Sequence, residues 1–111
     1  MDAHTLEAVG DFKRRLGRRY GDRLKAVFVF GSRARGEQGD ESDVDVAFFL
    51  DGPVDDPLRE ELALADDRLD VMFAHGLHVQ AWAFDAASME SPEDFRDPHL
   101  TRALLNEGVA V

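Results

Sequence analysis

Two aspartates and a Gly-Ser pair are the residues of this sequence whose types and spacing point to chemistry. Asp43 and Asp45 stand two apart at the start of an apolar stretch, and Gly31-Ser32 follow directly on the apolar run 27–30. Successive side chains of a strand point to opposite faces, so Asp43 and Asp45 are predicted to share one face, their Cα atoms about 6–7 Å apart. Two neighbouring carboxylates repel unless a cation lies between them, and a hard divalent ion is the natural choice.

The Gly-Ser pair supplies the complementary half of a site. A glycine directly after a buried strand lets backbone N–H groups approach an anion closely, and the Ser32 hydroxyl adds a donor there. A phosphate at Gly31-Ser32 and a metal at Asp43 and Asp45 together predict a nucleoside triphosphate held as its magnesium complex. Each half also has an ordinary interpretation, a plain turn or a solvated strand face. The combination at this spacing favours the nucleotide.

The same residues resemble the motif of the polymerase-β-type nucleotidyltransferase superfamily, in which Gly-Ser, ten residues and Asp-x-Asp follow one another. Here these are Gly31-Ser32 and Asp43-Val44-Asp45, while Ala34-Arg35-Gly36 and Ser42 are similar to the small bacterial and archaeal branch, the minimal nucleotidyltransferases. The resemblance implies an α/β (α+β) fold with a small mixed sheet and helices packed on one face, in a single domain over residues 1–111. It also implies transfer of a nucleoside monophosphate from a triphosphate to an acceptor hydroxyl, with AMP as the expected nucleotide.

The resemblance assigns roles to the motif residues. Gly31, Ser32, Arg35 and Ser42 would bind the nucleotide, which is ATP or another triphosphate. Asp43 and Asp45 would be the catalytic metal ligands, for Mg²⁺ or Mn²⁺. Arg33 and Arg35 are both able to hold triphosphate oxygens or to offset nearby carboxylates, and Arg35 is the one that belongs to the motif.

The chain departs from the superfamily at a third acidic residue, which the pattern places on a later strand. In the run 77–84 the candidate positions are His78 and Gln80, and neither is a carboxylate. His78 is a candidate catalytic residue because a neutral imidazole accepts a proton and ligates a metal. It is equally explained as a polar residue on an open sheet face. The departure leaves an alternative function: a weak or inactive nucleotide-binding module, acting antitoxin-like through a helical HEPN-type protein.

Hydrophobic periodicity predicts the elements that must position these residues. Residues 3–20 form an amphipathic helix that Asp2 or Thr5 caps and Gly21 ends, and 24–30 form a central strand. A second helix begins with Asp56 as cap and Pro57 at its first position and runs to His75. Residues 77–84 are predicted as a strand, 98–106 as a helix and 109–111 as a final strand. The apolar stripe expected for the second helix comprises Leu58, Leu62, Ala65, Leu69, Met72 and Phe73.

Composition limits the class of protein. The 111 residues are 44% hydrophobic and contain no cysteine, which excludes a disulfide framework and a thiolate site. No apolar run reaches the roughly 20 residues of a membrane span, so a cytoplasmic protein is expected. The net charge is −10, divided into +5 over residues 1–35 and −15 over 36–111. So acidic a chain is a poor non-specific binder of nucleic acid.

The uneven charge also bears on partners. Lys13, Arg14, Arg15, Arg18 and Arg19 make one face of the first helix basic, whereas the second helix carries an acidic face. The basic face has a simple interpretation as a solvated helix surface. The two faces together predict association, either as a homo-oligomer or with a helical partner, that weakens as salt rises.

Overall fold

A four-stranded mixed sheet forms the centre of the molecule, seen in a computed structural model that describes residues 1–36, 43–95 and 97–111. Its strands are β1 (Leu24–Phe30), β2 (Val44–Leu50), β3 (Val79–Asp85) and β4 (Val109–Ala110), in the order β3-β2-β1-β4. β1 is antiparallel to both β2 and β4, and β2 is parallel to β3. The sheet is therefore mixed, as the resemblance implied.

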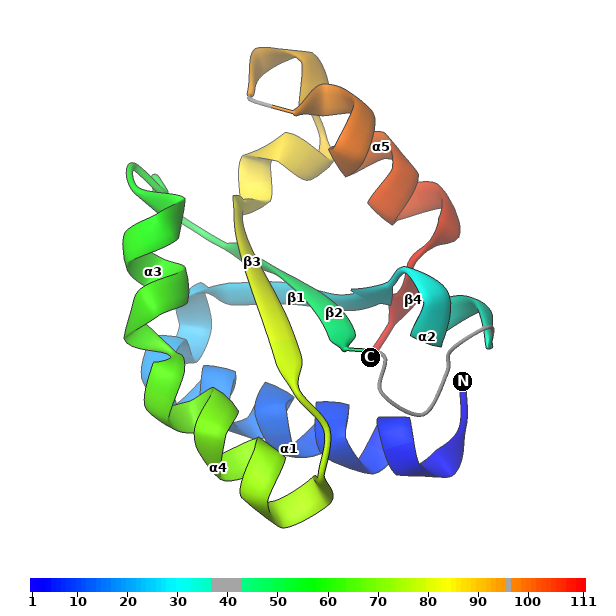
Figure 1. Ribbon diagram of the computed structural model, residues 1–111. Helices are drawn as coiled ribbons and strands as arrows, with labels where there is room; N and C mark the ends of the chain where they lie inside the picture. Colours follow the sequence, from blue (N-terminus) through cyan, green and yellow to red (C-terminus); the bar gives the residue numbers. More distant parts are fainter. Residues whose placement is uncertain (37–42, 96) are drawn as a thin grey trace.

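In the described parts of the chain, five α-helices surround the sheet: α1 (Ala3–Tyr20), α2 (Ser32–Arg35), α3 (Pro57–Ala63), α4 (Ala65–His75) and α5 (Pro98–Glu107). Figure 1 shows α1 and α4 side by side below one face of the sheet and α5 above the other. Short 3-10 turns cover Gly21–Arg23, Ala86–Met89 and Pro92–Asp94. Within the described ranges, no helix is both long and apolar enough to cross a membrane.

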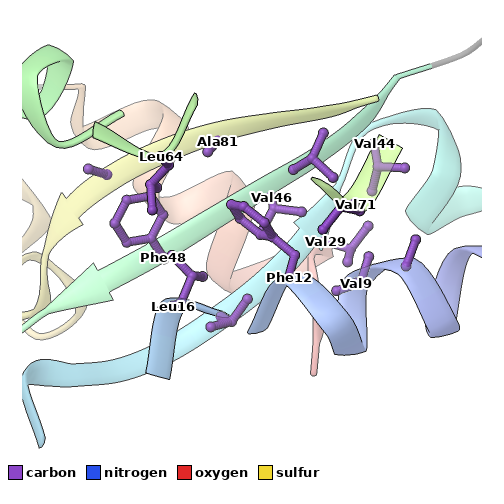
Figure 2. Close-up of a cluster of buried hydrophobic side chains, with 14 of the residues drawn as sticks. Val9, Phe12, Leu16, Val29, Val44, Val46, Phe48, Leu64, Val71 and Ala81 are labelled. Atoms are coloured by element: carbon purple, nitrogen blue, oxygen red, sulfur yellow. The ribbon is translucent and has the colours of Figure 1, made fainter. Parts of the chain in front are cut away.

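The main core lies between α1 and the sheet. Val9, Phe12 and Leu16 of α1 are fully buried against β-strand residues such as Val46 and Phe48, which point down from the sheet (Figure 2). α1 begins where predicted, since the Asp2 carboxylate accepts a hydrogen bond of 2.7 Å from the Thr5 backbone N–H.

A second, smaller core covers part of the opposite face, which is the face that carries Asp45. Ala47 and Phe49 of β2 pack there against Leu104 of α5, and Phe49 stacks on Phe84 with ring centroids 5.1 Å apart. α5 therefore covers the part of this face around Ala47 and Phe49, while the Trp82 side chain remains 41% exposed.

The second helix differs from its prediction. Asp56 caps it as expected, through a 3.1 Å hydrogen bond from the Arg59 backbone N–H. It breaks at Leu64, however, into α3 and α4. The break rotates one half against the other, so that Leu64 and Val71 are buried. The predicted apolar stripe is wrong: five of its six members are exposed, namely Leu58 (62%), Leu62 (61%), Ala65, Leu69 (45%) and Phe73 (75%). On α1, the apolar side chain of Leu6 is exposed as well.

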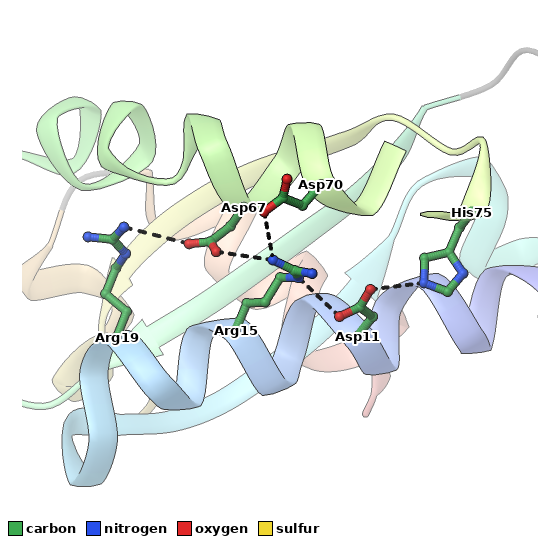
Figure 3. A network of polar contacts seen from close by, with 6 residues as sticks. All are labelled: Asp11, Arg15, Arg19, Asp67, Asp70 and His75. Atoms are coloured by element: carbon green, nitrogen blue, oxygen red, sulfur yellow. Dashed lines mark hydrogen bonds and ion pairs between the residues drawn. The ribbon is translucent and has the colours of Figure 1, made fainter. Parts of the chain in front are cut away.

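Charged side chains join α1 to α4 (Figure 3). Arg15 lies 3.0 Å from Asp11, 3.0 Å from Asp70 and 3.6 Å from Asp67, and the His75 ring lies 3.0 Å from Asp11. Arg19 adds a contact of 3.6 Å to Asp67. Part of the two oppositely charged faces that were expected to attract a partner thus meets inside the chain.

Candidate functional site

The turn after β1 is shaped by the aspartate beside it. Gly31 has φ +76°, a conformation that glycine adopts without strain. A Cβ at this position would lie 2.8 Å from Asp45 Oδ2, closer than Cβ atoms in proteins approach other atoms, so the Asp45 carboxylate would have to shift. Ser32 then opens the four-residue helix α2, whose first backbone N–H groups have no helical carbonyl before them. The predicted anion-binding turn and the predicted metal ligand therefore adjoin, and the backbone comes this close only because residue 31 is glycine.

Asp43 and Asp45 lie on the face predicted for them. Val44 between them is fully buried on the α1 side, which places both aspartates on the opposite side. Asp45 is paired with Phe30 of β1 and with Gln80 of β3. The Asp43 side chain is 47% exposed, whereas Asp45 is half-buried. One carboxylate is therefore set into the sheet and the other stands at its rim.

Trp82 of β3 is a site residue that no motif identified. Its side chain lies on the same face of the sheet as Asp45, and its ring meets Phe30 edge-on, with centroids 6.4 Å apart. Burial raises the pKa of Asp45; the Trp82 side chain opposes this and the Asp43 charge adds to it. The ionised form of Asp45 is therefore poised for a cation to stabilise it.

The two candidates for the third acidic position both approach Asp43. Gln80 Nε2 donates a hydrogen bond of 3.3 Å to Asp43 Oδ2, and His78 Nδ1 lies 3.7 Å from Asp43 Oδ1. In the strand register Gln80 is level with Asp45, while His78 precedes β3 and is half-exposed. Gln80 is thus the residue beside the inner aspartate, and His78 the one beside the outer.

The two arginines of the turn have different surroundings. Arg33 is buried, and its Nη1 donates a hydrogen bond of 3.1 Å to the Thr5 hydroxyl of α1. It anchors the turn to the first helix. Arg35 is exposed and lines a cavity of about 140 Å³ next to Gly31. Ser42, assigned to the nucleotide site by resemblance, lies outside the described residues.

The small cavity beside the turn was not foreseen. Most of its other walls come from α5, which is distant in sequence and contains no motif that indicates a binding site. The cavity is lined by Phe30, Gly31, Arg35, Leu100, Ala103, Leu104 and Glu107.

The aspartate pair fits a divalent ion that is shared with a substrate. Within the described ranges no three His, Cys, Asp or Glu side chains converge as a metal-binding group. Mg²⁺ is commonly bound by one or two carboxylates together with substrate phosphates and waters, not by an all-protein cage. Asp43 and Asp45, next to an anion-binding turn, are a donor set of that kind.

Comparison with solved structures finds proteins of the same fold. A toxin–antitoxin structure with AMP-PNP is 20% identical, has a TM-score of 0.58, and covers 89% of this chain and 68% of its own. A mutant of the toxin–antitoxin pair MntA-HpeT is 17% identical, with a TM-score of 0.55 and coverages of 88% and 67%. A candidate nucleotidyltransferase from Sulfolobus solfataricus is 18% identical, with a TM-score of 0.50 and coverages of 99% and 87%. These similarities show the fold.

Sequence comparison gives the family. No functionally curated protein matches the chain significantly. The model of the nucleotidyltransferase domain matches residues 9–111, which include the turn, both aspartates and every strand. The chain therefore belongs to the nucleotidyltransferase domain family.

Proposed function

We propose that this protein transfers a nucleoside monophosphate from a nucleoside triphosphate to an acceptor hydroxyl with the help of Mg²⁺ or Mn²⁺. AMP, donated by ATP, is the nucleotide we expect. The observation that carries the proposal is the contact between the Gly31 turn and Asp45. It puts an anion-binding backbone and a cation-binding carboxylate at one point, as a metal–triphosphate requires. The toxin–antitoxin neighbour solved with AMP-PNP supports ATP as the donor.

The residues divide the work of binding. The backbone of Gly31 and Ser32 would hold the phosphates beyond the reacting one, and Arg35 would reach them from the rim of the turn. Asp43 and Asp45 would hold the ion. When bound, the divalent ion neutralises phosphate charge and orients the triphosphate for in-line attack.

In the transfer itself, a bond forms between the acceptor oxygen and the α-phosphorus while the bond from the α-phosphorus to the bridging oxygen of the β-phosphate breaks. Pyrophosphate leaves with the electron pair of that bond, and the hydroxyl proton must pass to a base. His78 stands 3.7 Å from Asp43 and is the imidazole placed to accept it. Positioning and charge neutralisation account for most of the acceleration expected.

The direct test is incubation with α-labelled ATP and Mg²⁺, with the protein alone and with the protein encoded beside it. We expect label on an acceptor only when the ion is present, and none with the Asp43→Asn/Asp45→Asn double variant. ATP affinity that is equal with and without Mg²⁺, in wild type and double variant alike, would refute the site.

A second function is supported by a separate observation, the exposed row formed by Leu58 and Leu62 of α3 with Leu69 and Phe73 of α4. We call it the α3–α4 stripe. Leu58 and Leu62 stand four residues apart on α3, as Leu69 and Phe73 do on α4, so the members of each pair share a helix face, and exposed apolar faces mark interaction surfaces. Since neither His78 nor Gln80 is a carboxylate, the domain would then be a weak or inactive nucleotide-binding module that acts on a partner. The toxin–antitoxin neighbours support a protein partner. The partner proposed here is the helical, HEPN-type protein that the motif resemblance implies, met in the cytoplasm.

Charge favours a basic partner over a second copy at this stripe. Residues 55–73 contain seven Asp or Glu against Arg59 and Arg68, so the stripe runs through an acidic surface. Two copies facing each other here would bring like charges together. A helical partner with an apolar face rimmed by Lys or Arg complements both properties. Homo-oligomerisation through this stripe is the outcome that would contradict this choice of partner.

A further inference from the structure

Trp82 is a large apolar side chain that the fold leaves exposed on the face of Asp43 and Asp45. It is 41% exposed, whereas Ala47 and Phe49 on the same face are fully buried under α5. The other exposed large apolar side chains of the described ranges lie on α1, α3 and α4. Single exposed apolar residues are common on protein surfaces. The argument for a function therefore depends on where this ring lies.

The ring lies beside the inner aspartate. Trp82 follows Gln80 by two residues on β3, and Gln80 is paired with Asp45 of β2. Trp82 itself is paired with Ala47, whose small side chain leaves space for an indole next to Asp45. Burial raises the pKa of Asp45 and the Trp82 side chain opposes that rise, so the two groups are close.

Aromatic contacts hold the ring in place. It meets Phe30 of β1 edge-on, with centroids 6.4 Å apart and an angle of 60° between the ring planes. Next to it on the same face, Phe84 stacks on Phe49 with centroids 5.1 Å apart. Edge-on and offset contacts of this kind are favourable for aromatic pairs. The ring is therefore held in position, while two fifths of the residue remain open to a ligand.

Open space adjoins the ring. Trp82 lines a cavity of about 290 Å³ between α3, the end of β3 and α5, whose apolar lining includes Leu58, Phe84, Phe95 and Leu100. An apolar cavity of about 150 Å³ is sufficient for a benzene ring. The space next to Trp82 is therefore large enough for the fused rings of a purine.

The proposed path of the triphosphate across the sheet leaves its base on this side. The outer phosphates would lie on the Gly31–Ser32 turn after β1, and the ion and the α-phosphate at Asp43 and Asp45 of β2. The next strand in the sheet is β3, which carries Trp82. Two strand spacings amount to about 10 Å, which is the scale of an extended nucleoside triphosphate. A nucleotide that crosses the strands in this order brings its base to Trp82.

We propose that Trp82 binds the nucleobase of the donor triphosphate by stacking. The inference rests on the proposed transfer function and adds the residue that holds the base. Stacking on an aromatic side chain is available to every base, because each has a π-face, and differences in stacking strength produce modest preferences. We therefore expect purine triphosphates to bind more tightly than pyrimidine triphosphates, and all four to bind.

The test compares two ligands with Mg²⁺: ATP, and inorganic triphosphate, which has the phosphates without the base. Because Trp82 is the only tryptophan of the chain, its fluorescence should be quenched by ATP and remain unchanged with triphosphate. In calorimetric titration, Trp82→Leu should bind ATP about tenfold more weakly, which corresponds to ~1.4 kcal/mol. Trp82→Phe keeps a π-face and should lose no more than about threefold.

Both variants should bind inorganic triphosphate as the wild-type protein does. This comparison separates stacking from a structural role, because a tryptophan that only supported Asp45 would affect both ligands alike. Phe95→Leu is the matched control: Phe95 is an aromatic residue of the same cavity, but it lies outside the sheet and should leave both affinities unchanged.

Equal affinity of the wild-type protein for ATP and triphosphate would overturn the proposal, as would an equal loss for both ligands in Trp82→Leu. Failure of the transfer function gives a different result: ATP would still bind more tightly than triphosphate and quench Trp82, but no acceptor would become labelled from α-labelled ATP. If neither ligand bound, the nucleotide site and this inference would both be refuted.

Discussion

Three features act on the Asp45 carboxylate. It must be ionised to hold a cation, it is half-buried beside Trp82, and the Gly31 backbone lies against it. Burial, opposed by the Trp82 side chain and assisted by Asp43, raises its pKa. A raised folded-state pKa means that the stability linked to Asp45 is present at low pH and is lost as the carboxyl ionises. At neutral pH the ionised Asp45 carboxylate therefore destabilises the metal-free fold, and a bound cation would offset this destabilisation.

The first prediction separates the effect of Asp45 on stability from its effect on nucleotide binding. Asp45→Asn should lower Mg²⁺-dependent ATP affinity by about tenfold or more, because one of two charged ligands is lost. It should leave the melting temperature of the free protein at pH 7 equal to or above that of wild type, because no buried charge remains. Calorimetric titration and thermal unfolding measure the two effects. Asp66→Asn, on the exposed side of α4, is the control expected to change neither. A clear drop in melting temperature would contradict the account of Asp45.

The second prediction concerns the third acidic position. Because Gln80 is level with Asp45, Gln80→Asp should increase divalent-metal affinity and nucleotide transfer, whereas His78→Asp, at the exposed rim, should do less. Labelled transfer with Mg²⁺ and Mn²⁺ measures this. His78→Ala tests the imidazole directly: a tenfold or greater loss of transfer, with ATP affinity kept, would show that it accepts the proton. Equal transfer by wild type and His78→Ala would remove His78 from the mechanism.

At the scale of elements, local pattern predicted most of what positions the site. Strand alternation placed Asp43, Asp45, Gln80 and Trp82 on one face, and the apolar run gave β1 its observed bounds. In a strand, backbone geometry alone fixes the face to which each side chain points, so this prediction needs no information about tertiary contacts.

The errors arose where packing decides between equivalent local patterns. A helix through residues 57–75 could bury either of two apolar rows, one with Leu62 and Leu69, the other with Leu64 and Val71. The longer row fits an uninterrupted helix, but the break at Leu64 lets the second row reach α1 and the sheet. The buried role of Arg33 likewise depends on Thr5, 28 residues away. Neither contact is encoded within a short window of sequence.

The third prediction tests the charged contact between α1 and α4. Arg15→Gln should reduce the free energy of unfolding by about 1 kcal/mol, at the upper end for partly exposed pairs, because Arg15 faces Asp11, Asp67 and Asp70 together. The loss should shrink in 1 M salt. Arg14→Gln, one residue earlier and exposed, is the matched control. Urea unfolding at low and high salt provides the measurement; equal effects of the two variants would contradict a special role for Arg15.

The fourth prediction follows from Asp11 in the same contact. Burial opposes ionisation of Asp11, but hydrogen bonds from His75 and Arg15 outweigh it and lower its pKa. A lowered folded-state pKa means that Asp11 stabilises the fold above its ordinary pKa of 3.8, and that this stabilisation is lost as the pH falls below it. Asp11→Asn should therefore be less stable than wild type at pH 6, and the difference should vanish on acidification. A difference that stays constant from pH 6 to pH 3 would refute this.

At the scale of the whole molecule, one side holds the chemistry and a neighbouring side holds the α3–α4 stripe, and the 290 Å³ cavity lies where they meet. The internal ion pairs between α1 and α4 neutralise part of the acidic surface of α4 on its inner side only. Asp66 is exposed on the same helix as Leu69 and Phe73, and Asp70, although paired with Arg15, has a side chain that is 58% exposed. The outer surface thus keeps both the apolar contacts and the negative charge that a basic helical partner would use.

The last prediction concerns that surface. The double variant Leu62→Gln/Phe73→Gln should fold with stability within about 0.5 kcal/mol of wild type, because both side chains are mostly exposed. It should also bind Mg²⁺–ATP normally, since neither residue is near Asp45. Its complex with a helical partner of the proposed kind should weaken at least tenfold in co-purification and titration. The affinity of the wild-type protein should fall as salt rises, because the partner's cations would meet an acidic rim. Leu6→Gln, an exposed apolar residue on α1, is the matched control and should bind as wild type does. A complex that the double variant forms with unchanged affinity would place the interface elsewhere, and a wild-type dimer that this variant breaks would make a second copy the occupant of the stripe.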